Sequence, residues 1–177
     1  GQMFVNRMQS AANRMRQLIN DLLSYSRVTT AANPFSKVSL KDVLAGVLSD
    51  LQIRIEETNA VIDIGELPVI EADALQMRQL FQNLIGNALK FRKPDVDPVI
   101  TITAESSRGE GLESPTPAVT ISVADNGIGF EQQFKEQIFV IFQRLHSRSE
   151  YEGTGIGLAT CRKIVERHQG FIDAIGR

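Results

Sequence analysis

The chain reads Ser-Val-Ala-Asp-Asn-Gly-Ile-Gly-Phe over residues 122–130, where an acidic residue and a glycine-rich turn end an apolar run. The run from Ala118 to Val123 contains β-branched residues and is typical of a buried strand. Asp125 is therefore predicted to stand at the end of that strand and to face a pocket. Gly127 and Gly129 allow a flat ligand to approach the main chain closely. Asp-Asn-Gly is also a common composition for a simple turn, so the tripeptide alone does not distinguish a ligand site from a turn.

Three further segments accompany this turn. Residues 83–91 (Asn-Leu-Ile-Gly-Asn-Ala-Leu-Lys-Phe) precede it in a strongly helical stretch, and residues 138–145 (Ile-Phe-Val-Ile-Phe-Gln-Arg-Leu) and 153–159 (Gly-Thr-Gly-Ile-Gly-Leu-Ala) follow it. One such segment recurs easily by chance, whereas four in this order do not. Together they resemble the four ATP-binding motifs of the sensor histidine kinases. Residues 87–94 and 142–157 are most similar to the phytochrome-type branch of that family.

The resemblance extends over about residues 8–175. It implies an α/β fold of the GHKL type, a two-layer sandwich with helices on one face of a mixed sheet, preceded by a long bundle or coiled-coil helix. It also implies an enzyme, an ATP-dependent protein histidine kinase of a two-component system, that binds Mg-ATP and transfers the γ-phosphoryl group to a histidine. That group would pass to an aspartate of a response regulator. The kinase would be a cytoplasmic homodimer.

The adenine site is predicted to centre on Asp125. A carboxylate at the end of a buried strand can accept a hydrogen bond from the adenine amino group in a low-dielectric pocket. Phe91 and Ile128 could line the faces of the ring, although ordinary core positions explain these two residues equally well. Gly127 and Gly129 complete this part of the expected ATP-binding set.

An asparagine pair lies on the helix before this turn. Asn83 and Asn87 are four residues apart and therefore share one helix face. Mg²⁺ takes hard oxygen ligands, usually few of them from protein; Asn87 resembles the magnesium ligand of the family, and Asn83 is a second candidate. Lys90 would place a positive charge near the phosphates. A single exposed asparagine is usually just solvated. The prediction of a magnesium site therefore depends on the four-residue spacing of the two asparagines and on Lys90 beside them.

The third motif is a glycine-rich loop before a predicted helix. The free N–H groups and the positive end of that helix favour phosphate, although a GxGxG pattern also caps helices. Residues of this loop and of the segment before it join the expected ATP-binding set: Arg144, Gly153, Thr154, Gly155, Ile156, Gly157 and Leu158. Arg144 or Arg148 is expected to reach phosphate, with a solvated loop as the alternative.

Asn83 also distinguishes a kinase from hydrolytic relatives. Gyrase-type, mismatch-repair and heat-shock-chaperone ATPases of related fold carry a glutamate at the corresponding place, as general base for water, and an amide cannot take that proton. The pocket is therefore expected to hold ATP for an outside nucleophile. Neither His146 nor His168 lies in the His-Glu motif of the family's phosphoacceptor. We therefore expect the acceptor histidine to be absent from this chain.

Residues 3–27 are predicted to form one amphipathic helix. Its apolar residues repeat as an a/d seam over three heptads: Phe4, Met8, Ala11, Met15, Leu18, Leu22 and Tyr25. Such a helix needs a partner helix, and residues 18–27 resemble the second helix of the kinases' dimerisation and histidine-phosphotransfer hairpin. Packing on its own domain is the alternative. We expect residues 1–28 to be this helix, 29–38 a linker, and 39–177 the ATP-binding domain.

Helices and strands are predicted along that domain from caps and periodicity. Ser39 and Asp73 are expected to cap two helices. The predicted helices cover residues 40–57, 74–91, 131–138 and 154–167. The predicted strands cover residues 60–64, 69–71, 99–104, 118–125 and 171–175. The family normally adds one strand after the last of these, so the domain is expected to lack its final strand.

Composition excludes several other classes. The chain has 177 residues, of which 42% are hydrophobic, enough for one domain with an appendage. Its net charge of −2 gives no global attraction to nucleic acid or to an anionic membrane. No apolar run approaches the length of a membrane span. Cys161 is the only cysteine, which excludes an internal disulfide and fits a reducing compartment. No nucleic-acid partner and no membrane contact are expected.

Two rival functions remain open from the sequence. The first is an ATPase or serine kinase on the same fold, which would turn ATP over without a histidine substrate. The second is a non-catalytic nucleotide-sensing or dimerisation module, which would bind ATP and yet form no acid-labile phosphoprotein. The input signal, the identity of the response regulator and whether the full-length protein is anchored in a membrane cannot be read from these residues.

Overall fold

The computed structural model describes residues 2–108, 117–145, 151 and 153–176. The chain forms two compact units, one of residues 34–129 and one that combines residues 1–33 with 130–177. The first unit is contiguous in sequence, whereas the second is built from both ends of the chain.

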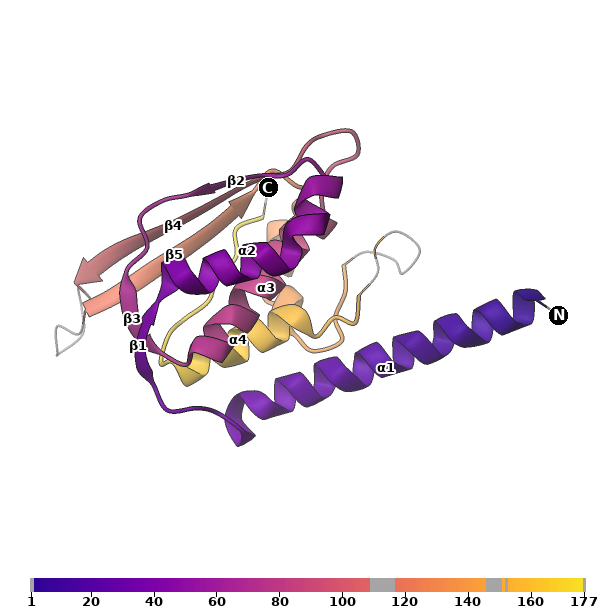
Figure 1. Cartoon of the computed structure of the whole chain (residues 1–177), viewed down its shortest axis with the longest axis horizontal. Coiled ribbons are helices and arrows are strands. Elements are labelled where there is room, and N and C mark those ends of the chain that lie inside the picture. The colour runs from indigo at the N-terminus through magenta and orange to yellow at the C-terminus, as the bar shows by residue number, and fades with distance from the viewer. Residues whose placement is uncertain (1, 109–116, 146–150, 152, 177) are drawn as a thin grey trace. The chain divides into compact units, whose positions relative to one another are not determined.

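The described residues of unit 34–129 form two small sheets (Figure 1). β1 (Ser36–Ser39) pairs antiparallel with β3 (Val69–Ala72). β2 (Val61–Ile64) pairs parallel with β4 (Val99–Arg108), and β4 pairs antiparallel with β5 (Pro117–Asp125). The three-stranded sheet is therefore mixed, as predicted. β1 falls partly in the stretch expected to be a linker.

Both helices of this unit begin at the predicted caps. α2 (Leu40–Glu57) follows Ser39, whose hydroxyl accepts a hydrogen bond from the Asp42 N–H at 3.3 Å. α3 (Ala74–Lys90) follows Asp73, whose carboxylate accepts from the N–H groups of Leu75 and Gln76 at 3.0 and 3.3 Å. Each cap satisfies backbone donors that the first helical turn leaves unpaired.

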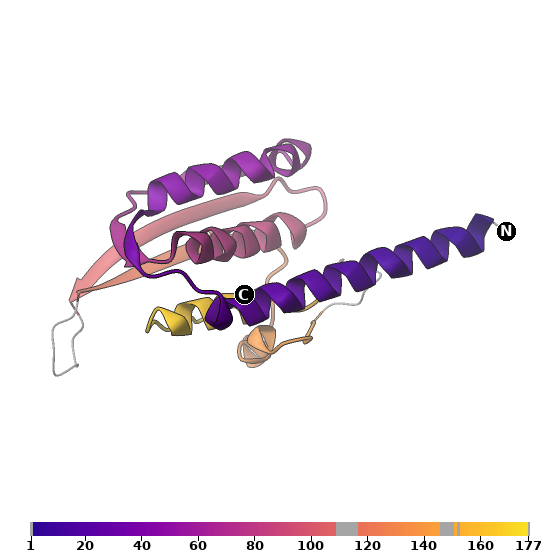
Figure 2. The same ribbon diagram turned by 60° about the horizontal axis from the view of Figure 1, so that its bottom comes forward.

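Helices α2 and α3 lie side by side against one face of the three-stranded sheet (Figures 1 and 2). The core between them consists of side chains that are at most 1% exposed: Leu44, Val47, Phe81, Ile85, Ile100 and Ile102. Burial of side chains of this size stabilises a fold by about 1.5–3 kcal/mol each. On α3, Leu80, Leu84 and Ala88 are spaced four apart; Leu80 and Ala88 are buried, and Leu84 is half-buried.

The strand that ends at Asp125 is less buried than the sequence predicts. Between Ala118 and Ala124, odd-numbered side chains are half-buried and even-numbered ones are exposed. In the part of the chain that the structure describes, β5 lies at the edge of its sheet, in the order β2-β4-β5. The prediction of a buried strand is wrong because helices cover only one face, so alternate residues are shielded.

Within its described residues, the second unit contains two α-helices and two short 3₁₀-helices. α1 (Gln2–Thr30) extends the helix predicted at residues 3–27, and its C-terminal part lies beside α4 (Gly157–Arg167) in both views (Figures 1 and 2). The helix predicted at 131–138 is instead two single turns, η1 (Gln132–Phe134) and η2 (Gln137–Phe139). No helix in the described residues is long and apolar enough to cross a membrane.

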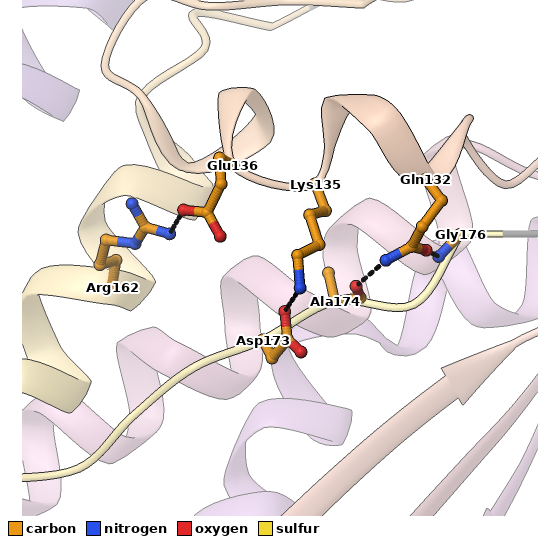
Figure 3. Close-up of polar contacts among 7 residues, drawn as sticks. All are labelled: Gln132, Lys135, Glu136, Arg162, Asp173, Ala174 and Gly176. Atoms are coloured by element: carbon orange, nitrogen blue, oxygen red, sulfur yellow. Dashed lines mark hydrogen bonds and ion pairs between the residues drawn. The ribbon is translucent and has the colours of Figure 1, made fainter.

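The strand predicted at residues 171–175 does not form. This segment pairs with no strand in the described part of the chain, and Phe171 and Ile175 are 84% and 82% exposed. Side chains of the η1 region hold it instead (Figure 3): Lys135 Nζ lies 3.4 Å from the Asp173 carboxylate, and Gln132 accepts from the Gly176 N–H at 2.7 Å. Alternating apolar residues fit a strand, but a strand also needs a neighbour for its backbone.

Candidate functional site

One face of α3 carries the predicted polar residues. Asn83, Asn87 and Lys90 are all half-buried and lie on one side of the helix, together with Gly86. A Cβ placed on Gly86 would meet no heavy atom within 4 Å. This face of α3 is therefore open at Gly86, and a ligand could occupy the space there.

The end of α3 meets the glycine-rich turn. The helix ends at Phe91, whose N–H donates to the Asn87 carbonyl at 2.9 Å, and the Phe91 carbonyl accepts from the Ile128 N–H at 2.9 Å. A Cβ on Gly127 would lie 2.5 Å from the Phe91 carbonyl oxygen, so only glycine fits there. Two of the motifs that the sequence separates by more than thirty residues are thus in direct backbone contact.

Asp125 is positioned by its own turn. One of its carboxylate oxygens, Oδ1, accepts a hydrogen bond from the Gly127 N–H at 2.8 Å. The side chain is exposed, so the expectation that it sits in a low-dielectric pocket is wrong for this structure. Asp125 pairs with Ile100 and so shares the sheet face on which the helices pack, but it stands at the end of a strand that is an edge strand among the described residues, and it stays exposed there. The turn nonetheless fixes the direction of the carboxylate.

Asn126 has a structural role that the sequence did not reveal. Its Oδ1 accepts from the Val99 N–H at 2.9 Å, and its Nδ2 donates to the Asp97 carbonyl at 3.1 Å. These bonds tie the turn to the start of β4. The neighbouring residues of Asn126 indicate only a turn, and its partners lie 27 and 29 residues away, so no local signal could have identified them.

Lys90 and Phe91 contact each other at the end of the helix. The Lys90 ammonium lies 4.1 Å from the centroid of the Phe91 ring, a distance at which a cation is attracted to an aromatic face. Lys90 therefore covers one face of this half-buried ring. A flat ligand that stacks on Phe91 would have to use the other face or displace Lys90.

The other unit carries the second glycine-rich segment. The Phe142 N–H donates to the Gly155 carbonyl at 2.9 Å, which closes the loop. Gly155 has φ +75°, and a Cβ there would lie 2.9 Å from the Gln143 carbonyl oxygen. Positive φ and close approach both require glycine at this position. The segment before the loop and the loop itself are therefore one structural element.

The Arg144 side chain forms hydrogen bonds to the backbone of the glycine loop that follows it in the sequence. Its Nη1 donates to the Gly153 carbonyl at 2.6 Å, and its Nη2 donates to the Tyr151 carbonyl. The guanidinium thus spans two carbonyls of the loop. His146, Ser147 and Arg148, which the sequence placed between these segments, lie outside the described residues.

The glycine loop leads directly into α4. Ile156 is 1% exposed and occupies the N-cap position, and it offers no side-chain hydrogen bond to the first turn. Among the described residues, the N-cap side chain of α4 therefore gives no capping bond of the kind that Ser39 and Asp73 give to α2 and α3. The Thr154 hydroxyl donates to the carboxylate of Asp21 on α1 at 2.5 Å, a contact that no sequence pattern predicted.

The structure offers few ligands for a metal ion. Among the described residues, no group of three or more His, Cys, Asp and Glu side chains could hold one. The oxygen donors on the open face of α3 are the neutral amides of Asn83 and Asn87. This donor set fits a hard cation that takes most of its ligands from phosphate and water.

Comparison with known proteins reveals clear similarities. The family described as "Histidine kinase-, DNA gyrase B-, and HSP90-like ATPase" matches residues 72–176. Phytochrome-like protein Cph1 of Synechocystis sp. is 43% identical over 169 residues, which are 96% of this chain and 21% of that protein. Cyanobacterial phytochrome A of Nostoc sp. is 46% identical over the same lengths. The predicted likeness to the phytochrome-type branch is confirmed.

Solved structures show the same fold. The structure of full-length ShkA in complex with AMPPNP superimposes with a TM-score of 0.73 at 26% identity, covering 99% of this chain and 36% of that one. The catalytic domain of the histidine kinase ThkA gives a TM-score of 0.58 at 26% identity, covering 76% of this chain and 82% of that domain. The predicted GHKL-type α/β fold is confirmed. This chain spans about a fifth of the length of the curated phytochrome relatives.

Proposed function

Because this chain belongs to the family of histidine kinase-, DNA gyrase B- and HSP90-like ATPases, we propose that it is the ATP-binding catalytic part of a sensor histidine kinase. It binds Mg-ATP and presents the γ-phosphoryl group to a histidine supplied by another segment. The observation that carries this proposal is the contact between the end of α3 and the turn at residues 125–129. That contact joins the ends of two motifs, which supports placing Asp125, Asn87, Lys90 and Phe91 around one helix end.

In this proposal Asp125 recognises the base of ATP. Its carboxylate accepts a hydrogen bond from the adenine amino group, while Oδ1 keeps its bond to the Gly127 N–H. Phe91 and Ile128 contact the ring, and Gly127 and Gly129 leave room for it beside the main chain. The exposure of Asp125 means that the arriving base itself must displace water from this carboxylate.

Asn87 is proposed as the Mg²⁺ ligand, with Asn83 as a possible second one. Both amide oxygens lie on the open face of α3, and Mg²⁺ would add its charge to that of Lys90 against the triphosphate. When bound, Mg²⁺ would neutralise part of the negative charge of the phosphates. Asn83, unlike a glutamate, cannot take a proton from water, so the α3 face holds ATP without promoting its hydrolysis.

The glycine loop is proposed to contact the phosphates. Its members offer backbone N–H groups at the start of α4, where a helix end favours anions: Gly153, Thr154, Gly155, Ile156, Gly157 and Leu158. Arg144 is proposed to add positive charge beside them, since two of its five N–H donors are used on loop carbonyls.

The proposed partners follow from α1 and from the family. Four side chains of the heptad seam are exposed, among them Phe4 and Met8 at 72% and Met15 at 59%. A second copy of this helix is proposed to cover them in a homodimer. A response-regulator receiver domain is proposed to take the phosphoryl group from the histidine, in the cytoplasm.

Calorimetric titration with Mg-ATP tests the proposal. We expect magnesium-dependent binding that Asp125→Asn weakens by roughly tenfold or more, since a charged hydrogen bond contributes about 1.5–3 kcal/mol. Asn87→Ala should weaken binding with magnesium present and have little effect on nucleotide binding without it. Absence of binding to a chain that circular dichroism shows to be folded would refute the proposal. ATP turnover without a histidine substrate would favour the rival ATPase or serine-kinase function.

A further inference from the structure

The glycine loop is attached to helix α1 through one hydrogen bond. The Thr154 hydroxyl donates to Asp21 Oδ2 at 2.5 Å, and both side chains are half-buried. The two residues are 133 positions apart and belong to the same compact unit. Thr154 stands between two loop glycines, in the segment proposed to contact phosphate.

Asp21 is held in place for this contact. It is the only acidic residue between Gln2 and Thr30. Its other oxygen, Oδ1, accepts from the Gln17 side chain at 2.7 Å, one turn earlier on the same helix. Each carboxylate oxygen thus has a partner, which orients Oδ2 toward Thr154 and costs little side-chain freedom when the bond forms.

Further contacts keep this part of α1 beside the loop. Lys163 on α4 donates to the Tyr25 carbonyl at 3.1 Å, and its ammonium lies 4.2 Å from the centroid of the Tyr25 ring. Arg167, one turn later on α4, donates to the Asn33 carbonyl at 2.6 Å. Lys163 and Arg167 on α4 therefore contact the chain on the C-terminal side of Asp21. The most exposed large side chains of the seam, Phe4, Met8 and Met15, lie on the N-terminal side of Asp21.

We propose that Asp21 is a positioning residue that restrains the glycine loop through Thr154, so that helix α1 lowers the affinity of the loop for the phosphates of ATP. The carboxylate engages the hydroxyl, and it places a negative charge where a triphosphate must approach. The two anions compete for the same loop. This inference rests on the proposed function, since it concerns the regulation of the same ATP site.

The restraint works in both directions. If α1 weakens ATP binding through Asp21, then bound ATP weakens the hold of the loop on α1 by the same factor. A movement of α1 that separates Asp21 from Thr154 would raise ATP affinity. Occupancy of the ATP site would, in turn, release α1 from this contact.

Calorimetry on the 177-residue chain tests the inference with two ligands. Asp21→Ala should bind Mg-ATP about fivefold more tightly than wild type, a size typical of coupling between sites. Its affinity for adenosine, which has no phosphates, should not change. Gln17→Ala should produce a smaller shift in the same direction, and Asn20→Ala, an exposed neighbour on α1, should produce none. A general effect on folding would change the affinities for Mg-ATP and for adenosine together.

A double-mutant cycle tests whether Asp21 affects Mg-ATP affinity through Thr154. In a Thr154→Val background, which lacks the hydroxyl, Asp21→Ala should have no further effect on Mg-ATP affinity, whereas in a Thr154→Ser background the gain should persist. Wild type and Asp21→Ala binding Mg-ATP equally well would overturn the inference and leave the proposed function intact. A gain that survives in Thr154→Val, or that extends to adenosine, would also overturn it. Failure of both folded proteins to bind Mg-ATP would refute the proposed function and this inference with it.

Discussion

Gly127 shows how a single residue joins two motifs. A Cβ at this position would lie 2.5 Å from the Phe91 carbonyl oxygen and 2.6 Å from Asp125 Oδ1. The first of these atoms is backbone at the end of α3, and the second belongs to the carboxylate proposed to bind adenine. The first cannot move without disturbing the Ile128–Phe91 hydrogen bond, and the second cannot move without disturbing its own bond to the Gly127 N–H.

Gly127→Ala should therefore lower the free energy of unfolding by about 1–3 kcal/mol, as overpacking does elsewhere. Gly86→Ala provides the matched control, because a Cβ on Gly86 meets no atom within 4 Å and the residue lies inside α3. That substitution should raise the free energy of unfolding by about 0.5–1 kcal/mol through helix propensity. Urea denaturation measures both changes, and equal effects of the two substitutions would contradict the argument.

At the scale of elements, the segment at residues 171–176 is held by one ion pair and by hydrogen bonds to Gln132, not by pairing with a strand in the described structure. The Ala174 backbone N–H and, with a smaller effect, the Lys135 ammonium hold the pKa of Asp173 below its ordinary value. Figure 3 shows Lys135 and Asp173 pointing toward each other. A carboxyl whose pKa is lower in the folded state contributes stability above its ordinary pKa, and this contribution is lost as the pH falls through the lowered value.

Nuclear magnetic resonance titration of the Asp173 carboxyl carbon measures whether the pKa of this group is lowered. We expect a pKa below the ordinary aspartate value in wild type. Lys135→Met should raise that pKa only part of the way, because the Ala174 N–H remains, and Lys135→Arg should keep it low. A wild-type pKa at or above the ordinary value would show that the contacts of this segment do not form in solution.

At the scale of the whole molecule, the two ends of helix α1 differ in what they contact. Its C-terminal third contacts the glycine loop and α4 through Asp21 and Tyr25. Its N-terminal part leaves the large side chains of Phe4, Met8 and Met15 exposed. Exposed apolar side chains in a continuous heptad row indicate a partner helix, which is why a homodimer is proposed.

Met15→Glu should convert a dimer to a monomer in sedimentation velocity, because it places a charge in the middle of the seam. Asn13→Glu, an exposed position on the opposite side of the same helix, should leave the dimer intact. Both variants should keep the far-ultraviolet circular dichroism of the rest of the chain. A wild-type chain that sediments as a monomer at high micromolar concentration would contradict the proposed homodimer.

Much of the architecture follows from local sequence. Ser39 and Asp73 cap the predicted helices because a cap needs only a side-chain oxygen two or three residues before a backbone donor. Strand alternation, the heptad seam and the glycines at 127 and 155 are likewise readable from a few neighbouring residues. The order of the four motifs determined the family, and this order is a property of the sequence alone.

Tertiary structure decided what depends on distant partners. Residues 171–175 alternate like a strand, but they find no neighbouring strand in the described structure and are held by Lys135 and Gln132 instead. Asp125 ends an apolar run, but an edge position leaves it exposed. Thr154 meets Asp21 across 133 residues. The physical reason is that periodicity and capping are set within one or two turns, whereas burial, pairing and long-range hydrogen bonds depend on which remote segments meet.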